Sequence, residues 1–360
     1  MDAKVKTIAA EIVRRVAGCA HSAAVLCTHG IARQIYTTSA LRRTSTRVKI
    51  AMAKAPRPET LKQIKGQPEV VNLAEMLIAG AKRRGEALDH VLLTGPAGTG
   101  KTTMAKVLAN EMGWKFKELP IDSLSKPDEV QRELLQLAPN TILFIDEIHN
   151  LPRKSQEQFF HAMEDGTIIV TIQGESVKYR LPAFTLVGAT TNSEKLVRPF
   201  RDRFPNPFEM TLYSTESLIS VAEGMADSLG LAYDPAAIET IAEMSGGTPR
   251  LVWRNRSRAR DAMAMINEDR LTVQAVQEMM RRTGQDPLGL GKNARKMLQL
   301  LAQRGSMSLR SLSSNLSINP QMIQSDFEPL LRRYDLITTT AEGRSITEKG
   351  KQYLQDQGLL

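Results

Sequence analysis

Cysteine is scarce in this chain, whose 360 residues include only Cys19 and Cys27. Two cysteines make neither the disulfide framework of a small secreted protein nor a zinc site, and such low usage fits a reducing compartment. Long hydrophobic runs are missing as well, because no stretch approaches the roughly 18–20 apolar residues that a membrane span needs. We therefore expect a protein of a reducing compartment that does not cross a membrane.

Acidic residues are rare in the first part of the chain. Residues 1–54 contain ten Lys and Arg but only Asp2 and Glu11, which accounts for +8 of the net charge of +9. This composition resembles an organellar transit peptide. The alternative that we favour is either an unstructured basic extension or a start codon placed too far upstream, with Met52 as the functional start. Since the rest of the chain is almost neutral, the overall charge is weak evidence for nucleic-acid binding by the folded part.

The remaining sequence has the composition of a folded protein. The chain is 42% hydrophobic and 24% charged, and its length suggests two or three domains. After Pro56, short apolar strands alternate with helices, which is typical of a parallel sheet with helices on both faces. The predicted elements are helices at about 68–84 and 100–112, strands at 90–94, 141–145 and 184–189, and a hairpin at 167–181.

The C-terminal half of the sequence has a different pattern. Residues 214–282 are predicted to be helical throughout, and 286–291, with Pro287 and two glycines, to form a linker. The last unit is predicted to contain helices near 293–303, 308–316 and 320–333, then β-like segments at 336–340 and 344–347. These changes predict a basic extension, a large α/β domain, a helical domain and a C-terminal domain, at 1–54, 55–213, 214–285 and 292–360.

A glycine-rich segment matches a phosphate-binding loop. Residues 95–102, Gly-Pro-Ala-Gly-Thr-Gly-Lys-Thr, fit G-x-x-x-x-G-K-[ST] between a predicted strand and a predicted helix. The glycines allow backbone N–H groups to turn toward phosphate oxygens, and the positive end of the helix adds to the attraction. Lys101 would reach the β- and γ-phosphates of ATP, and the Thr102 hydroxyl would bind Mg²⁺. The predicted contacts are Gly95, Gly98, Gly100, Lys101, Thr102 and Thr103.

Two acidic residues follow the buried strand at 141–145. Carboxylates at the carboxyl end of a central strand lie where ligands bind in parallel sheets. Asp146 would hold Mg²⁺ through water, and Glu147 would orient and deprotonate the attacking water. Together with the glycine loop, this pair predicts nucleotide hydrolysis.

Further polar residues lie after the third strand and in the helical part. The Thr191 hydroxyl would lie beside the γ-phosphate, where it could position the water. Arg201 and Arg203 lie in Pro-Phe-Arg-Asp-Arg-Phe near the rim of the sheet. An arginine donated to a neighbour's nucleotide stabilises transition-state charge. Arg250, in Gly-Thr-Pro-Arg at the start of a helix, could fold back on the phosphates.

In this order the motifs resemble those of the AAA+ ATPases and, within them, the RuvB family of Holliday-junction branch-migration motors. The resemblance covers about residues 56–355. The glycine loop and acidic strand are shared by many NTPases, whereas the combination is more specific. Its most telling segments are Gly66-Gln67, Asp-Glu-Ile-His149, Ala-Met-Glu-Asp165, Arg-Asp-Arg-Phe204 and Gly-Thr-Pro-Arg250. The implied fold is α/β: a P-loop AAA+ parallel sheet with a helical lid and a C-terminal winged helix.

The resemblance also implies roles for single residues. It places Pro56 and Arg57 at the adenine site, and Glu164 and Asp165 beside the nucleotide. It makes Arg201 the arginine finger that acts on a neighbour's ATP. The remaining matches are Tyr213 as a nucleotide contact and Arg250 as the second sensor.

The sequence departs from the family pattern in two places. The family has a hairpin that docks its junction-binding partner RuvA, and residues 166–184 form a shorter one here. In the wing of the winged helix, Arg344 is kept as the predicted DNA contact, while Thr339 and Glu342 replace family arginines. We interpret the chain as a divergent member of the family whose docking to a RuvA-like protein is in doubt.

Two functions fit these residues. The first is a DNA motor that uses ATP and Mg²⁺ and translocates duplex or four-way-junction DNA as a homohexameric ring. Its support is the ATP site plus a C-terminal domain at 292–360 with ten basic and six acidic residues, since Lys and Arg neutralise phosphates. The second is a non-motor AAA+ switch, clamp-loader-like or an adaptor. We expect a bacterial cytoplasm (the host of a phage or mobile element included), or an organellar matrix if residues 1–50 are a transit peptide.

Overall fold

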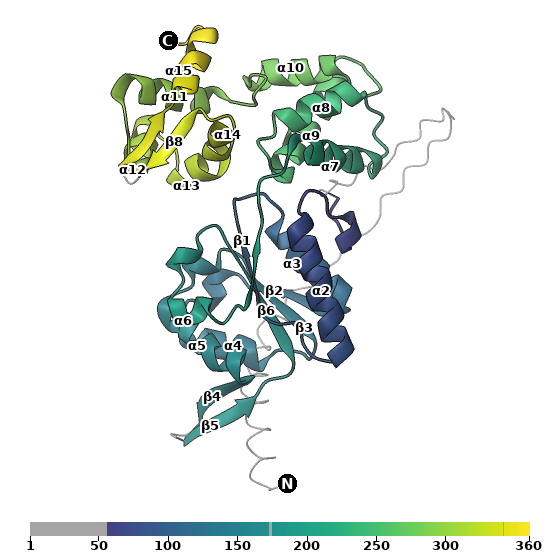
Figure 1. The fold of residues 1–360 in the computed structure, drawn as a ribbon, viewed down its shortest axis with the longest axis vertical. Helices are drawn as coiled ribbons and strands as arrows, with labels where there is room; N and C mark the ends of the chain where they lie inside the picture. The colour runs from purple at the N-terminus through teal and green to yellow at the C-terminus, as the bar shows by residue number, and fades with distance from the viewer. Residues whose placement is uncertain (1–55, 173–174, 341) are drawn as a thin grey trace, which may run out of the picture. The chain divides into compact units, whose positions relative to one another are not determined.

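The computed structural model describes residues 56–172, 175–340 and 342–360, so the predicted N-terminal extension lies outside the described residues. Its largest sheet has five parallel strands in the order β2-β3-β6-β1-β7 (Figure 1). The three strands predicted from apolar runs are the three central ones, because a strand covered on both faces needs apolar side chains on both. Their bounds are β1 (Val91–Thr94), β3 (Thr141–Ile145) and β6 (Phe184–Thr190).

Helices cover both faces of this sheet. Successive side chains of a strand point to opposite faces. Val91 and Leu93 of β1 pack in one apolar cluster, with helices α2 (Pro68–Arg84) and α3 (Lys101–Met112). Leu92 packs in the other cluster, with α4 (Pro127–Leu135), α5 (Arg153–Glu164) and α6 (Arg198–Arg201) (Figure 1). The predicted α/β class is confirmed.

The two edge strands were not predicted from the sequence. β2 (Lys115–Glu118) reads Lys-Phe-Lys-Glu, and β7 (Asn206–Glu209) contains Pro207. Proline has no N–H to donate, so within sheets it is confined mainly to edges. Both strands leave side chains exposed at the edges of the sheet, namely Lys115 and Glu118 of β2 and Pro207 and Glu209 of β7. Their sequences therefore lack the apolar run that marks the central strands.

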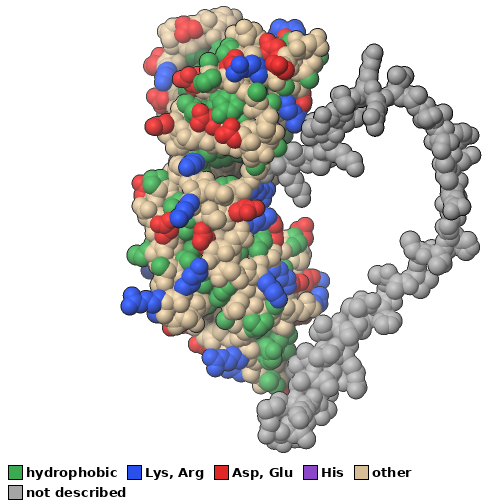
Figure 2. Space-filling view, turned by 90° about the vertical axis from the view of Figure 1, so that its right-hand side faces the viewer, with side chains coloured by type: hydrophobic (Ala, Val, Ile, Leu, Met, Phe, Trp, Pro, Cys, Tyr) green, Lys and Arg blue, Asp and Glu red, His purple; other side chains and the backbone are tan. Residues whose placement is uncertain are grey.

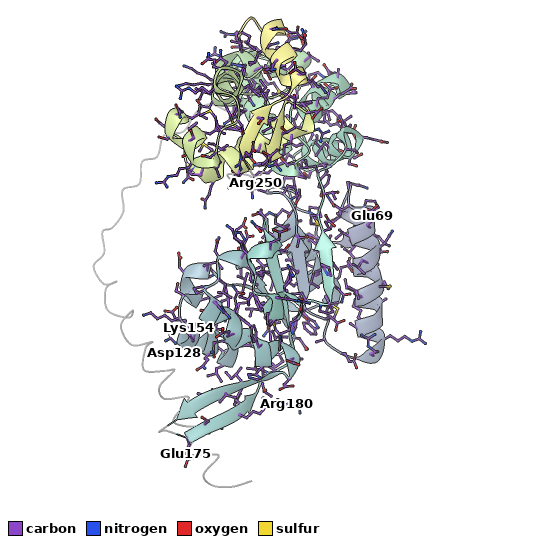
Figure 3. The ribbon with its side chains drawn as sticks, turned by 60° about the vertical axis from the view of Figure 1, so that its left-hand side comes forward. Glu69, Asp128, Lys154, Glu175, Arg180 and Arg250 are labelled. Atoms are coloured by element: carbon purple, nitrogen blue, oxygen red, sulfur yellow. The ribbon has the colours of Figure 1, made fainter. Side chains whose placement is uncertain are left out.

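A separate antiparallel hairpin extends from this part of the fold. Its strands are β4 (Thr167–Ile172) and β5 (Glu175–Arg180), as predicted for 167–181. Figure 3 shows it projecting away from the large sheet, with Glu175 toward its tip and Arg180 at its base. Every residue of β5 is exposed.

The segment after the large sheet is helical, as predicted. Its helices enclose an apolar cluster of their own. They are α7 (Thr215–Asp227), α8 (Pro235–Glu243), α9 (Pro249–Met265) and α10 (Val273–Thr283). None of the described helices is long and apolar enough to cross a membrane.

The last segment forms a winged helix. The predicted helix at 320–333 is interrupted by a π turn, because Pro329 cannot donate to the carbonyl four residues earlier. The C-terminal helix was not predicted. The elements are α11 (Lys292–Arg304), α12 (Leu309–Leu316), α13 (Pro320–Met322), η5 (Ile323–Phe327), α14 (Glu328–Arg333), β8 (Ile337–Thr340), β9 (Gly343–Ile346) and α15 (Glu348–Asp356).

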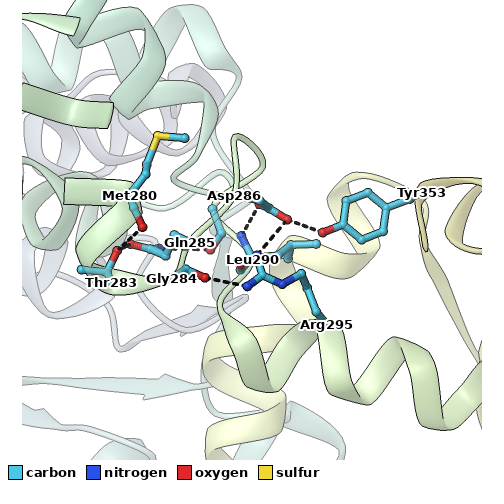
Figure 4. Close-up of polar contacts among 9 residues, drawn as sticks. Met280, Thr283, Gly284, Gln285, Asp286, Leu290, Arg295 and Tyr353 are labelled. Carbon is cyan, nitrogen blue, oxygen red and sulfur yellow. Dashed lines mark hydrogen bonds and ion pairs between the residues drawn. The ribbon is translucent and has the colours of Figure 1, made fainter. Parts of the chain in front are cut away.

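The predicted linker at 286–291 is an anchored turn (Figure 4). The buried carboxylate of Asp286 accepts the Leu290 backbone N–H at 2.8 Å and the Tyr353 hydroxyl. Arg295 donates to the carbonyl oxygens of Gly284 and Leu290, at 2.8 and 3.1 Å. Burial is the main cause that raises the pKa of Tyr353, and the bond to Asp286 raises it further. The proline and glycines thus end the helical pattern here, while these hydrogen bonds hold the segment in one conformation.

Candidate nucleotide site

The glycine-rich loop lies between β1 and α3, which is the context that the sequence motif requires. Gly95, Gly98 and Gly100 have φ values of +128°, +83° and +105°, where residues with a Cβ are strained. Gly95 also approaches the Met210 backbone so closely that a Cβ would collide with the carbonyl oxygen. Glycine is therefore needed at these positions for the loop to close around a phosphate.

Lys101 is held inside the mouth of the loop. Its side chain lies in the first turn of α3, and the residue is only 7% exposed. The Nζ atom donates to the carbonyl oxygens of Gly95 at 2.8 Å and Pro96 at 3.0 Å. Burial lowers the pKa of Lys101, while the carboxylates of Glu147 and Asp146 oppose that shift. A buried cation whose two carbonyl partners are neutral gains by exchanging them for negatively charged phosphate oxygens.

The two predicted acids lie side by side at the end of β3. The Asp146 carboxylate is exposed and accepts the Glu147 N–H at 3.0 Å. Glu147 has left-handed backbone angles, φ 47° and ψ 44°, which cost of order 1–3 kcal/mol for a residue other than glycine. This turn directs the Glu147 carboxylate toward the end of β6, where Thr191 donates to it at 3.3 Å.

His149 belongs to the same cluster, and sequence reasoning assigned it no role. Its Nδ1 atom lies 3.2 Å from Glu147 Oε2 and 2.9 Å from the Thr190 hydroxyl. Burial lowers the pKa of His149, and Glu147 opposes that shift. A neutral imidazole here orients the Glu147 carboxylate without neutralising it. The only sequence signal was the position of the histidine two residues after the acidic pair.

Tyr213 forms a wall on another side of the loop. Its ring packs against Gly66, where a Cβ would lie 2.6 Å from Tyr213 Cδ1. The Gln67 amide exchanges two hydrogen bonds with the Thr211 backbone, at 2.8 and 3.2 Å, and so fixes this contact. A Cβ at Gly100 would lie 3.7 Å from the Tyr213 hydroxyl oxygen. Burial raises the pKa of Tyr213 to about 12, so the phenol is neutral.

Arg250 approaches the loop from the helical part of the chain (Figure 3). It lies in the first turn of α9, and a Cβ at Gly98 would come within 3.1 Å of Arg250 Cβ. Thr248 contacts Gly98 in the same way. Lysine, carboxylate, threonine, tyrosine and arginine from separate segments thus converge on one glycine loop.

Comparisons with known proteins agree with this geometry. Residues 56–210 match the family model of the Holliday junction DNA helicase RuvB P-loop domain, and residues 287–355 match that of the RuvB C-terminal winged helix domain. The chain belongs to the RuvB family. The RuvB subunit of the branch migration complex from Fervidobacterium nodosum is 36% identical over 305 residues, which are 83% of this chain and 88% of the relative. The RuvB of Lactobacillus johnsonii is 37% identical over 306 residues, 83% and 90% of the two chains.

A solved structure supports the same assignment. The Thermotoga maritima RuvB Holliday junction branch migration motor has a TM-score of 0.75 to this chain at 33% identity. The match covers 83% of this chain and 98% of that one. As a member of the RuvB family, the chain has the P-loop AAA+ fold with a helical lid, formed here by α7–α10, and a winged helix.

Arg201 ends α6 and Arg203 lies two residues further on, and the two arginines have different surroundings. Arg203 Nη2 lies 2.5 Å from Glu164 Oε2, Nη1 donates to the Pro199 carbonyl at 2.6 Å, and the guanidinium stacks 4.6 Å from the centre of the Phe160 ring. The Arg201 side chain makes no hydrogen bond or ion pair with any other residue that the structure describes. Arg203 is held in place inside its own chain, whereas Arg201 is half-exposed and open to an external partner.

Glu164 and Asp165 lie away from the glycine loop of their own chain. Asp165 lines a pocket with His90 and Phe184, which lie at the amino ends of β1 and β6. The glycine loop follows the carboxyl end of β1. Within one chain, therefore, the structure does not bring the two acids beside the nucleotide site, contrary to what the resemblance implies.

The structure does not join Pro56 and Arg57 to the loop either. The residues that follow them are tied to the far end of α3: Asn110 donates to the Glu59 carbonyl, and Glu111 accepts the Leu61 N–H, both at 3.0 Å. The loop lies at the other end of that helix. An adenine contact by Pro56 or Arg57 stays a prediction.

Arg344 lies in β9 but does not present a free guanidinium on the wing. Its Nε atom donates to Glu328 Oε1 at 2.7 Å, and the two side chains are 14% and 5% exposed. Arg332 binds the second oxygen of Glu328 at 3.0 Å. This position does not fit the exposed phosphate contact that we predicted, because the charge is committed to a buried carboxylate. The sequence pattern identified the arginine but not its partner, which lies on α14.

Proposed function

We propose that the protein is an ATP-driven motor that moves DNA in branch migration. The observation that carries this proposal is the convergence of Lys101, Asp146, Glu147 and Arg250 on the glycine loop, in a chain of the RuvB family that also has a winged helix. Each element alone is common, whereas together they are the main groups that the nucleotide-binding subunit itself contributes to ATP hydrolysis.

Each residue has a part in hydrolysis. Lys101 would exchange its two carbonyl partners for oxygens of the β- and γ-phosphates. Oxygen ligands suit Mg²⁺, and the Thr102 hydroxyl and the exposed Asp146 carboxylate are the residues that would hold it. When bound, Mg²⁺ neutralises charge on the phosphates. Glu147, oriented by His149, would accept the proton of the attacking water, which Thr191 would help to position.

The transition-state arginine would come from a neighbouring subunit. Arg201 is the residue we assign to this role because none of the other residues in 56–172, 175–340 and 342–360 pairs with its guanidinium. Such an arrangement requires a ring, and we propose a homohexamer. Glu164 holds Arg203 beside it, so this acid would act at the same contact between subunits by fixing the orientation of Arg203 and its neighbours.

DNA would be held by exposed basic residues of the winged helix, since Arg344 is engaged. Residues on the surface of that segment include Arg310, Lys349 and Lys351. On the face drawn in Figure 2, Lys and Arg side chains are interspersed with acidic ones and do not form one large basic patch. A ring would sum the phosphate contacts of its subunits. The substrate we propose is duplex DNA leading from a four-way junction.

The hairpin β4–β5 is the surface we propose for a RuvA-like partner. Val177 and Tyr179 are 37% and 42% exposed and lie on one face of it, opposite Val170 and Ile168. Exposed apolar side chains on a projecting hairpin favour a protein contact over a nucleic-acid one. The protein would act where the host keeps its DNA, in a bacterial cytoplasm or, if residues 1–50 are a transit peptide, in an organellar matrix.

A branch-migration assay tests the function directly. The full-length protein is incubated with a four-way junction, with ATP, and with or without a RuvA-like protein, and the release of duplex arms is followed. We expect ATP-dependent release that the Lys101→Ala variant does not support. If DNA neither stimulates ATP turnover nor is remodelled, and nucleotide instead controls binding to a protein, the non-motor switch is the correct function.

A further inference from the structure

The segment 211–215, here called the hinge, leads from the sheet into α7 and forms part of the nucleotide site. Tyr213 in this segment packs its ring on Gly66, close to Gly100 of the glycine loop. The Tyr213 backbone N–H donates to the Gly247 carbonyl at 2.9 Å. The following residue of that turn, Thr248, contacts Gly98 of the loop. Any displacement of the hinge therefore moves one wall of the site.

An arginine of the winged helix binds this hinge. Arg333, at the end of α14, donates from Nη1 to the Tyr213 carbonyl at 2.6 Å and from Nη2 to the Thr215 hydroxyl at 2.8 Å. The guanidinium is planar and directs its donors in a fixed fork, so two such bonds set the position of the backbone. Gly247 makes room for the fork, because a Cβ there would lie 2.6 Å from Nη1.

The winged helix is also packed directly on the lid. Leu251 of α9 belongs to the apolar cluster of the winged helix. Leu330 lies over Gly246 so closely that a Cβ there would be 2.6 Å from Leu330 Cδ2. Arg254 of α9 lies 3.7 Å from Asp326. A force on the winged helix thus reaches the lid through packing, and Arg333 extends the connection to the hinge.

We propose that Arg333 is a positioning residue that couples DNA engagement by the winged helix to the nucleotide site through the hinge. The path runs from α14 to the Tyr213 carbonyl and from there to the Tyr213 ring beside the loop. Coupling between two ligands is reciprocal, so nucleotide must change DNA affinity by the same factor as DNA changes nucleotide affinity. The inference rests on the proposed function, since it assumes that the winged helix holds DNA.

The test compares two neighbouring arginines in the full-length protein. Arg333→Met removes the fork, whereas Arg332→Met removes the same charge from a side chain that is 51% exposed and bound to Glu328. Duplex DNA affinity is measured with and without a non-hydrolysable ATP analogue, and ATP turnover with and without DNA. Arg333→Lys, which cannot reproduce the fork, and Thr215→Ala, which removes one acceptor, extend the series without a large change in packing.

In the wild type we expect the analogue to change DNA affinity by at least about fivefold, which is at the lower end of typical coupling. Arg333→Met should bring that ratio close to one and abolish DNA stimulation, while its basal turnover and its DNA affinity without nucleotide match those of Arg332→Met. For Arg333→Lys and Thr215→Ala, the ratio of DNA affinities with and without the analogue should lie between those of the wild type and Arg333→Met. The proposal is overturned if Arg333→Met keeps the wild-type ratio of DNA affinities, or if Arg332→Met loses that ratio to the same extent. Should the wild type show no coupling at all, the motor function itself fails, and the two failures are thereby distinguished.

Discussion

Replacing Arg344 by alanine should lower the local stability of β8 and β9, the wing of the winged helix, by more than it lowers the free energy of DNA binding. The substitution removes one of two cations that bind Glu328, whose side chain is 5% exposed. Breaking a buried ion pair by removing one partner costs roughly 3–5 kcal/mol. Arg332 remains on the other oxygen at 3.0 Å, so part of the compensation is kept. We therefore expect a local loss of about 2–3 kcal/mol, below the full range for an unpaired buried charge.

Hydrogen exchange of the full-length protein measures this loss where it occurs. At 1.4 kcal/mol per factor of ten, amides of β8 and β9 should exchange about 30- to 150-fold faster in Arg344→Ala. The double variant Arg344→Ala with Glu328→Gln removes the buried charge and should recover part of the protection. Arg310→Ala, which alters an exposed arginine of the same segment, is the matched control and should leave β8 and β9 unchanged.

The result that refutes this reasoning is equally specific. If Arg344→Ala exchanges like the wild type, and log DNA affinity falls less steeply with log salt by about one unit of slope, Arg344 is a phosphate contact. The buried pair with Glu328 would then contribute little to the stability of the wing.

Four further predictions concern the ATPase part. Lys101→Ala should abolish ATP turnover, and Glu147→Gln should bind ATP without hydrolysing it, because an amide cannot accept the proton; wild-type turnover in Glu147→Gln would disprove the general base. Arg201→Ala should cut ATP turnover about 10³-fold while nucleotide binding stays intact. Mixing this variant with Lys101→Ala subunits should restore some turnover, because some sites then pair an intact glycine loop with an intact Arg201. If Arg203→Ala loses turnover in this way and Arg201→Ala does not, the roles of the two arginines are exchanged. Burial lowers the pKa of His90 to about 4, and Nδ1 accepts the Leu186 N–H at 2.9 Å, so the fold binds the neutral ring. Below pH 6.5 the unfolded chain therefore binds more protons than the folded one, and the free energy of unfolding should fall by up to about 3 kcal/mol between pH 6.5 and 4. Thermal unfolding measures this dependence, and the His90→Gln variant should lack it.

Sequence reasoning succeeded where one residue type is forced by local geometry. Gly95 and Gly98 need left-handed backbone angles, and the strand before Asp146 needs apolar side chains on both faces. Such requirements leave a pattern within a few neighbouring positions. The same holds for the helix at 68–84, whose bounds match α2.

It was less successful where a role depends on a partner distant in sequence. Arg344 carries the same charge whether it faces DNA or Glu328, and only the fold decides between them. Arg201 and Arg203 are two residues apart, yet only Arg203 meets Glu164. Edge strands such as β2 were missed because their faces are only partly covered and therefore do not require an apolar run. Charge and polarity indicate chemistry, whereas tertiary contacts decide how it is used.

The anchored turn at 286–291 has a mechanical consequence. Were those six residues slack, they could extend by up to about 20 Å before transmitting any pull, since an extended chain spans about 3.3–3.6 Å per residue. One base pair of duplex DNA rises by about 3.4 Å. A slack connection would thus absorb several base pairs of travel at every stroke. With Asp286 bonded to Leu290 and Tyr353, the connection is stiff, and a stroke as small as one base pair can reach the DNA.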